Sequence, residues 1–421
     1  MNKHLSGMPP FQLNQLFGDF RLLIILFVSL RLMMLIVYQP LVVNGVERGM
    51  SAGGDFQTYF QIASLSDTAG LPMRDWWTEF PPLWAYLSVA LYKLAPNYGA
   101  FSMLLSLLFL VVDTGNLVLI RKIAARLYRE DTATTLGWIY ALLASPLVFV
   151  FWTFEVLVTF CILLSVWWLL RERNGRLAIA IAVGVLIKFT PAVVFGAVWR
   201  YRERRRAAVS TLIAVVIVIL VYGYFFVQNV SMTLPSLTAQ FNKASYQTVW
   251  ALLDGNYRTG NFGPLEDRLD PDRATVVQGN PPRVPSMMRL GIAVLIGMFV
   301  FARTRRFDDK GLVAFVGISL VIFFLQAQGW SPQWLVQIIP FVLLCFPNRD
   351  GVLIVILLSL VTFAEYPFLF IRTGDTGGEI TGPLITPFVA LIAVRTLMLV
   401  GVCVAFYRIL RQPRNHQGMA V

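Results

Sequence analysis

Residues 207–228 read AAVSTLIAVVIVILVYGYFFVQ, an uncharged run that directly follows the basic stretch Arg200–Arg206. About 20 apolar residues in a helix cross the hydrocarbon core of a membrane, and the helix satisfies its own backbone hydrogen bonds there. The other strong apolar runs occupy residues 20–43, 100–120, 155–170, 286–302 and 384–407. The sequence therefore predicts an all-α, polytopic membrane protein.

The composition of the chain supports this prediction. Of the 421 residues, 57% are hydrophobic and only 14% are charged, whereas soluble domains carry about 25% charged residues. Cys161, Cys345 and Cys403 fall inside apolar runs, so we expect them to be packing residues. The run after Phe20 is too long for a cleaved signal and is expected to be retained as the first span.

The positive charges lie at the ends of the apolar runs, which indicates the orientation of the chain. Short basic loops stay on the cytoplasmic side of a membrane. The excess of basic residues behind the net charge of +12 is therefore explained by membrane orientation, and no nucleic-acid partner is expected. We expect one membrane domain over residues 1–421 of a bacterial plasma membrane protein, with outer loops at 44–79 and 229–285 and a cytoplasmic tail at 408–421. The cytoplasmic loops are expected at 121–129, 171–176, 200–206 and 303–310.

Two segments, 80–95 and 177–199, would each reverse this topology if they crossed the membrane completely. The first is short for a span, and the second contains Lys188 and Pro191. Proline disrupts a helix interior, and lysine is costly in lipid. Both segments are predicted to be broken or re-entrant helices beside a polar cavity. With about nine full spans, the total is 9–13 transmembrane or re-entrant helices.

The first outer loop carries an acid directly after a glycine pair, in Gly53-Gly54-Asp55, and ends in Trp76-Trp77-Thr78-Glu79-Phe80-Pro81-Pro82. Solvated acids in an interfacial aromatic belt would explain the tryptophans. The glycine pair before Asp55 fits that interpretation less well and favours a functional role for this acid. The candidate substrate-binding residues of the loop are Tyr59, Trp76, Trp77 and Glu79.

Further polar residues lie near the outer ends of later spans. A buried Lys188 needs an anionic partner, such as a lipid phosphate or a carboxylate. Glu155 and Glu365 are candidate substrate residues that alternatively form structural ion pairs with Lys188 or Arg372. Amides, hydroxyls and tryptophans can bind sugars, or they can belong to a turn between two spans. This second set comprises Gln328, Ser331, Gln333 and Trp334.

Four of these segments resemble motifs of the glycosyltransferase-C (GT-C) superfamily, and most closely the polyprenol-phosphate-mannose-dependent mannosyltransferases. They are Asp55…Tyr59, Glu79-Phe-Pro-Pro-Leu83, Lys188-Phe-Thr-Pro191 and Ser331-Pro-Gln-Trp334. Phe80 stands where many relatives have tyrosine. A histidine of some members has no counterpart, because His4 and His416 lie near the ends of the chain.

The resemblance implies an enzyme that takes a sugar, mannose foremost, from a polyprenyl-phosphate carrier on the outer side of the membrane. It implies transfer with inversion to a hydroxyl of a glycolipid, polysaccharide or protein. Asp55 would be the general base, and Lys188, then Arg48 and Arg372, would bind the donor phosphate. No metal or other cofactor is expected. A lipid or polysaccharide transporter and a non-catalytic scaffold are the alternatives, although no internal repeat of the transporter kind is present.

Overall fold

The computed structural model describes residues 17–38, 41–43, 46–48, 54–143, 148–151, 153–260, 263–277, 279–369 and 378–413. Six of its helices are long and apolar enough to cross a membrane. They are α2 (Phe20–Tyr38), α5 (Tyr98–Leu127), α11 (Arg204–Gln228), α15 (Ser286–Arg303), α16 (Asp309–Gln326) and α20 (Ile385–Arg411). This helical bundle confirms the predicted all-α membrane fold.

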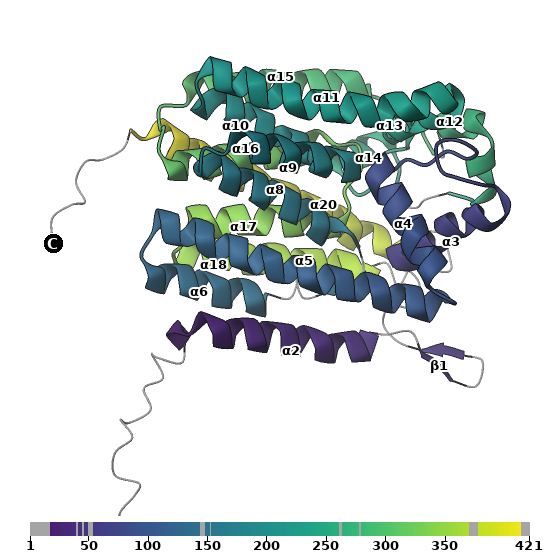
Figure 1. Cartoon of the computed structure of the whole chain (residues 1–421), viewed down its shortest axis with the longest axis horizontal. Coiled ribbons are helices and arrows are strands. Elements are labelled where there is room, and N and C mark those ends of the chain that lie inside the picture. Colours follow the sequence, from purple (N-terminus) through teal and green to yellow (C-terminus); the bar gives the residue numbers. More distant parts are fainter. Residues whose placement is uncertain are drawn as a thin grey trace, which may run out of the picture.

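Shorter helices complete the bundle, and most of them run along its long axis (Figure 1). They are α6 (Glu130–Leu142), α8 (Glu155–Leu170), α9 (Asn174–Ile187), α10 (Val194–Tyr201), α17 (Leu335–Cys345) and α18 (Arg349–Phe363). Every residue of α17 is buried, so this helix lies in the core. By contrast, Leu220 of α11 and Leu295 of α15 are exposed, which is the pattern of an integral membrane protein whose outer helices face lipid.

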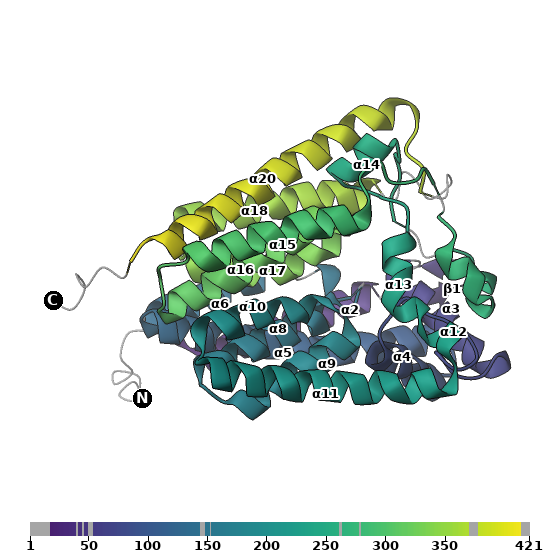
Figure 2. The ribbon, with the colours of Figure 1, turned by 90° about the horizontal axis from the view of Figure 1, so that it is seen from above.

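The segments predicted to be basic loops lie together at one end of the bundle. Arg126 in the last turn of α5 forms an ion pair of 2.5 Å with Asp309 at the start of α16. The backbone nitrogen of Arg305 donates to the carbonyl of Leu410 over 2.8 Å. The start of α2 and the end of α20 lie at this same end (Figures 1 and 2). The predicted basic segments therefore share one face of the protein.

Segment 177–199 is re-entrant, as predicted. Helix α9 ends at Ile187, a 3-10 turn (η1, Thr190–Val193) follows Lys188, and α10 then runs on to Tyr201. Arg202 after α10 pairs with Glu172 before α9 over 3.2 Å, so the two helices begin and end at the same face. The break places Lys188 at the tip of the re-entrant element.

The opposite end of the bundle is built from short helices (Figures 1 and 2). They are α3 (Gly54–Thr68), α4 (Pro82–Leu94), α12 (Val230–Thr233), α13 (Pro235–Asn242) and α14 (Val249–Asp254), and the 3-10 helices η2 (Glu266–Leu269) and η3 (Pro271–Thr275) follow them in the chain. Lys93 of α4 pairs with Asp67 of α3 over 2.5 Å, which ties the two helices together. Helix α4 begins at Pro82, a residue suited to a first helical turn. It has 13 residues and is too short to span a membrane, in line with the prediction for 80–95.

The sequence analysis missed a small antiparallel hairpin where the first apolar run meets the first outer loop. It pairs β1 (Leu41–Val43) with β2 (Val46–Arg48). Val42, Val43 and Val46 favour extended backbone, because β-branched side chains pack well on a pleated strand. The hydrophobicity of 20–43 hid this change of conformation after Tyr38.

Candidate active site

A cavity of about 510 Å³ lies where the short helices meet the ends of the bundle helices. Cavities of about 300–1,000 Å³ are typical of small-ligand sites. Asp55 of α3 and Lys188 of the re-entrant element both line it, although they lie far apart in the sequence. The predicted site residues in its wall are Asp55, Tyr59, Glu79, Glu155, Lys188, Gln328, Ser331, Gln333 and Trp334.

Asp55 is the second residue of α3, and two side chains hold its carboxylate. The hydroxyl of Tyr59, one helical turn later, donates to Oδ2 over 3.2 Å. The Nε2 amide of Gln333 donates to the same oxygen over 3.2 Å. No salt bridge to Asp55 occurs among the described residues. The carboxylate is thus oriented without being neutralised.

The surroundings of Asp55 make it a weaker acid than usual. Burial raises the pKa of Asp55 from 3.8 to about 7, the hydrogen bond from Tyr59 opposes this shift, and the nearby Glu155 adds to it. A general base is most effective when its pKa lies close to the working pH. Asp55 can therefore accept a proton near neutral pH.

Lys188 and Glu155 form the ion pair that the sequence analysis had considered. The Nζ of Lys188 contacts Oε1 of Glu155, and the amide of Gln337 donates to Oε2 of the same carboxylate. The ammonium also lies 4.9 Å from the ring centroid of Trp334 and 5.4 Å from that of Phe154. These contacts fix the lysine at the cavity wall and partly compensate its charge.

Glu79 lies just before α4, and its ion pairs connect the first outer loop to the second. Its two carboxylate oxygens accept from Arg268, and Lys243 lies 3.2 Å from Oε1. Burial opposes ionisation, but these two cations outweigh it and hold the pKa of Glu79 at about 2. Glu79 is therefore a permanent anion that anchors segment 243–268 against the first outer loop.

Tyr246 is a cavity residue that the sequence analysis did not select. Its ring lies across Gly329, where an added Cβ would come within 2.1 Å of a ring carbon. Its hydroxyl is 3.4 Å from Oγ of Ser331, and its backbone nitrogen donates to the carbonyl of Gln328 over 3.2 Å. In the sequence, the feature that indicates this close packing is Gly329 in Gln328-Gly329-Trp330, because glycine has no side chain.

Three predicted substrate residues, Trp76, Trp77 and Glu365, do not line the cavity. Trp76 is buried, and its indole donates to the carbonyl of Gly70 over 3.1 Å. Glu365 pairs with Arg395 of α20, which corrects the expectation that its partner is Lys188 or Arg372. Trp330 also donates to Glu365 over 3.1 Å, so this carboxylate is held behind the cavity wall.

The positions of two candidate cations relative to the cavity are not described by the structure. Arg372 lies outside the described residues. For Arg48 the structure describes the backbone, in strand β2, and not the side chain. Within the described part of the chain, no group of three or more His, Cys, Asp or Glu side chains is placed to hold a metal ion.

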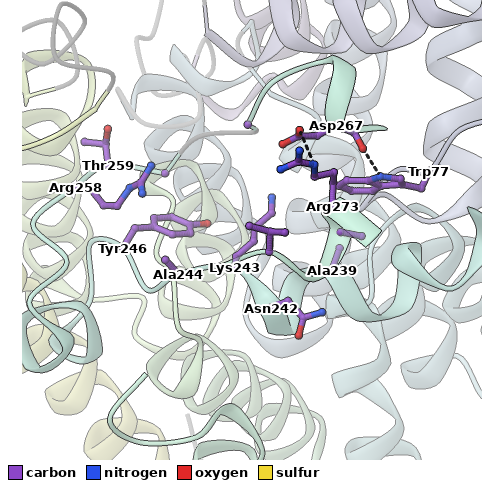
Figure 3. Close-up of a pocket in the computed structure, with 14 residues that line it drawn as sticks. Trp77, Ala239, Asn242, Lys243, Ala244, Tyr246, Arg258, Thr259, Asp267 and Arg273 are labelled. Carbon is purple, nitrogen blue, oxygen red and sulfur yellow. Dashed lines mark hydrogen bonds and ion pairs between the residues drawn. The ribbon is translucent and has the colours of Figure 1, made fainter. Parts of the chain in front are cut away.

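Trp77 belongs to a small pocket of about 70 Å³ beside the cavity (Figure 3). Its indole donates to the backbone carbonyl of Asp267 over 2.7 Å, and the carboxylate of Asp267 lies 4.0 Å from Arg273. Figure 3 shows Lys243 between Tyr246 and the side of the pocket formed by Trp77 and Arg273. Lys243 and Tyr246 line both spaces, so the small pocket adjoins the cavity.

A protein-family model, Glycosyltransferase family 87, matches residues 77–328. The chain belongs to glycosyltransferase family 87. This membership confirms the predicted resemblance to the GT-C superfamily and establishes the chain as a membrane glycosyltransferase. The range that matches family 87 includes Glu155 and Lys188 and leaves Asp55 and Gln333 outside.

Two solved structures resemble this family 87 member, both of an archaeal oligosaccharyltransferase from Archaeoglobus fulgidus. One is tethered to an acceptor peptide containing the NVT sequon, at 10% identity, and the other is in complex with an inhibitory peptide and a dolichol-phosphate, at 11% identity. Each alignment covers 94% of this chain and 56% of the other, with a TM-score of 0.38. The present chain thus spans little more than half the length of these proteins. No curated protein matches the sequence significantly.

Proposed function

We propose that this family 87 member transfers a sugar, mannose foremost, from a polyprenyl-phosphate carrier to an acceptor hydroxyl. The acceptor is a glycolipid, a polysaccharide or a protein, and the reaction takes place at the outer face of a bacterial plasma membrane. One observation carries the proposal: Asp55, with a pKa of about 7, shares a cavity with the cation Lys188. Such a pair matches the two charges that develop during this reaction.

Asp55 acts as the general base in a single displacement. As the acceptor oxygen attacks the anomeric carbon, its proton passes to the carboxylate of Asp55. The new bond joins the acceptor oxygen to the anomeric carbon, while the bond from that carbon to the phosphate oxygen breaks. The phosphate leaves with the bonding electron pair from the face opposite the attacking oxygen, so the configuration inverts. Asp55 then releases its proton to solvent, which restores the enzyme.

The leaving phosphate gains negative charge, and a cation already in position stabilises that charge. Lys188 is suited to this role because 22% of its side chain is exposed, whereas its partner Glu155 is only 3% exposed. The lysine side chain therefore keeps accessible surface while the glutamate side chain is enclosed. Its ion pair holds the lysine in position before substrate binds.

The wall of the cavity offers separate surroundings to a lipid and to a polar acceptor. Leu237 and Phe241 of α13, Leu290 of α15 and Phe323 of α16 supply apolar surface that suits a prenyl chain. Phe241 is 50% exposed, so this apolar side reaches the surface of the protein. The small pocket beside Lys243 has charged side chains in its lining, among them Arg258 and Asp267, which suit the approach of a polar acceptor (Figure 3).

The sugar would lie between these regions, against the segment that carries Ser331, Gln333 and Trp334. Hydroxyl and amide groups there can bond to sugar hydroxyls. Trp334 is itself stacked on Phe324, with ring centroids 5.1 Å apart, and is held rigidly. Rigid groups position a substrate at low entropic cost.

The donor class is tested by adding labelled donors to membrane vesicles that contain the protein and its natural acceptors. Polyprenyl-phosphate mannose, polyprenyl-phosphate glucose and GDP-mannose are compared, each with the label in the sugar. Label should enter the acceptor fraction from the polyprenyl-phosphate mannose. Transfer from GDP-mannose in the absence of any lipid-linked intermediate would contradict the proposal.

A further inference from the structure

The charged groups in the cavity wall are not all paired. They are Asp55, Glu79, Glu155, Lys188, Lys243 and Arg289. Glu79 pairs with Lys243, and Glu155 pairs with Lys188. Among the described residues this leaves one lining carboxylate and one lining guanidinium without a salt bridge, at Asp55 and Arg289. The proposed reaction uses the first as a base, but it assigns nothing to the second.

Arg289 lies one turn into α15 and is only 2% exposed. Its Nη2 donates to Oγ of Ser286 over 3.0 Å and to Oε1 of Gln328 over 3.1 Å. Its Nε and Nη1 are buried and have no hydrogen-bond partner in the described part of the chain. A buried guanidinium with unused donors is costly, because the lost hydration is not replaced.

The acid that acts on Arg289 electrostatically, Asp254, does not complete these hydrogen bonds. Its own oxygens accept from the hydroxyl of Ser245 over 2.6 Å and from the backbone nitrogen of Arg283 over 2.7 Å. Trp250 covers another side, with its ring centroid 5.5 Å from the guanidinium carbon. Arg289 is therefore restrained on the protein side and retains hydrogen-bonding capacity.

Arg289 is also held in one position. The oxygen of the Gln328 amide accepts from it, while the nitrogen of the same amide donates to the carbonyls of Gln240 and Lys243 over 2.5 and 2.6 Å. This network links α15 to the end of α13 and to the segment before Gly329. A cation that the fold orients in advance can bind an anion at little entropic cost.

We infer that Arg289 binds the phosphate of the lipid donor, beside the apolar surface that receives the prenyl chain. The inference rests on the proposed function. Leu290, the next residue, lines the cavity with Phe241 and Phe323, so the cation lies at the boundary between polar and apolar wall. A polyprenyl phosphate has the same boundary between its phosphate and its hydrocarbon chain. Guanidinium groups match the geometry of phosphate oxygens and bind them through charge-assisted hydrogen bonds.

The test measures the binding of farnesyl phosphate and of farnesol to the purified full-length protein in detergent. Wild type should bind the phosphate at least about tenfold more tightly than the alcohol, because a hydrogen bond between two charged groups is stronger than one to a neutral hydroxyl. Arg289→Gln should lose most of this ratio and bind farnesol as wild type does. Arg289→Lys should recover part of it, and Arg303→Gln, an exposed arginine at the other end of α15, should retain all of it.

The outcomes separate this inference from the proposed function. A wild-type ratio that survives in Arg289→Gln overturns the role of Arg289 and leaves the donor class standing. A wild-type protein that does not distinguish the phosphate from the alcohol overturns both. Arg289→Met is made in parallel as a second variant. A variant that binds farnesol as wild type does has an intact cavity. The ratio of farnesyl phosphate binding to farnesol binding is taken from that variant.

Discussion

The hydroxyl of Tyr59 donates to the carboxylate of Asp55 over 3.2 Å, from the next turn of the same helix. Because the hydrogen bond favours the ionised carboxylate, it lowers the pKa of Asp55. Burial acts in the opposite direction and is stronger, so the pKa remains at about 7. The ionisation of the proposed base is thus set by two neighbouring features of the cavity.

The first prediction concerns the pH dependence of transfer. The proposed base must be deprotonated, so kcat/KM should rise with pH, reach half its maximum near pH 7 and level off above it. Initial rates from pH 5 to 9 measure this profile. A half-maximum near pH 4, the ordinary range of an aspartate, would show that Asp55 is not the titrating group.

The second prediction follows from the hydrogen bond itself. Tyr59→Phe removes a donor that stabilises the charged carboxylate, so the half-maximum of kcat/KM should move to higher pH, by about one unit. Tyr92→Phe, which removes a hydroxyl bonded to Asp67 at the surface, serves as the control and should leave the profile unchanged. A shift to lower pH in Tyr59→Phe would reverse the proposed role of the bond.

The third prediction concerns the ion pair at the re-entrant tip. Lys188→Met leaves the buried Glu155 without its cation and should lower the free energy of unfolding by roughly 3 kcal/mol. Adding Glu155→Gln should restore most of this stability, because no charge then remains unpaired, but it should not restore transfer. Thermal unfolding and transfer rates measure the two effects. Full activity in the double variant would exclude Lys188 from phosphate stabilisation.

The fourth prediction concerns Gly329, which makes room for the Tyr246 ring. An alanine there would place its Cβ 2.1 Å from the ring, so the tyrosine must leave its position in the cavity wall. Gly329→Ala should reduce kcat/KM by roughly tenfold or more, since small displacements of a site are costly. Gly291→Ala, where an added Cβ meets nothing within 4 Å, should behave as wild type. Equal activity of the two variants would indicate that Tyr246 does not shape the site.

Much of the membrane fold could be predicted from local sequence. The apolar run at 207–228 became α11, and Lys188 with Pro191 correctly marked the break of a re-entrant helix. Both features depend on neighbouring residues, because lipid penalises charge and proline disrupts a helix wherever they occur. The hairpin at Leu41–Arg48 was missed because its valines are as compatible with a span as with a strand.

The site was less predictable because its contacts join distant parts of the chain. Lys188 and Glu155 were considered as partners, since both are charges near membrane ends. Glu365 was assigned to the wrong partners, because Arg395 lies inside an apolar run that was read only as a span. Arg289 was overlooked for a similar reason, as an arginine near a helix end is usually interfacial. Only the three-dimensional structure shows that it lines the cavity.

The most direct test of the account is the transfer rate of Asp55→Asn at saturating polyprenyl-phosphate sugar. The substitution keeps the shape of the side chain and an oxygen for the Tyr59 hydroxyl, but it removes the proton acceptor. Transfer should fall by roughly 100- to 10,000-fold, while farnesyl phosphate binding stays within about twofold of wild type. Asp67→Asn, at the other end of α3, should retain activity. Wild-type transfer by Asp55→Asn would contradict the proposal that this carboxylate accepts the proton.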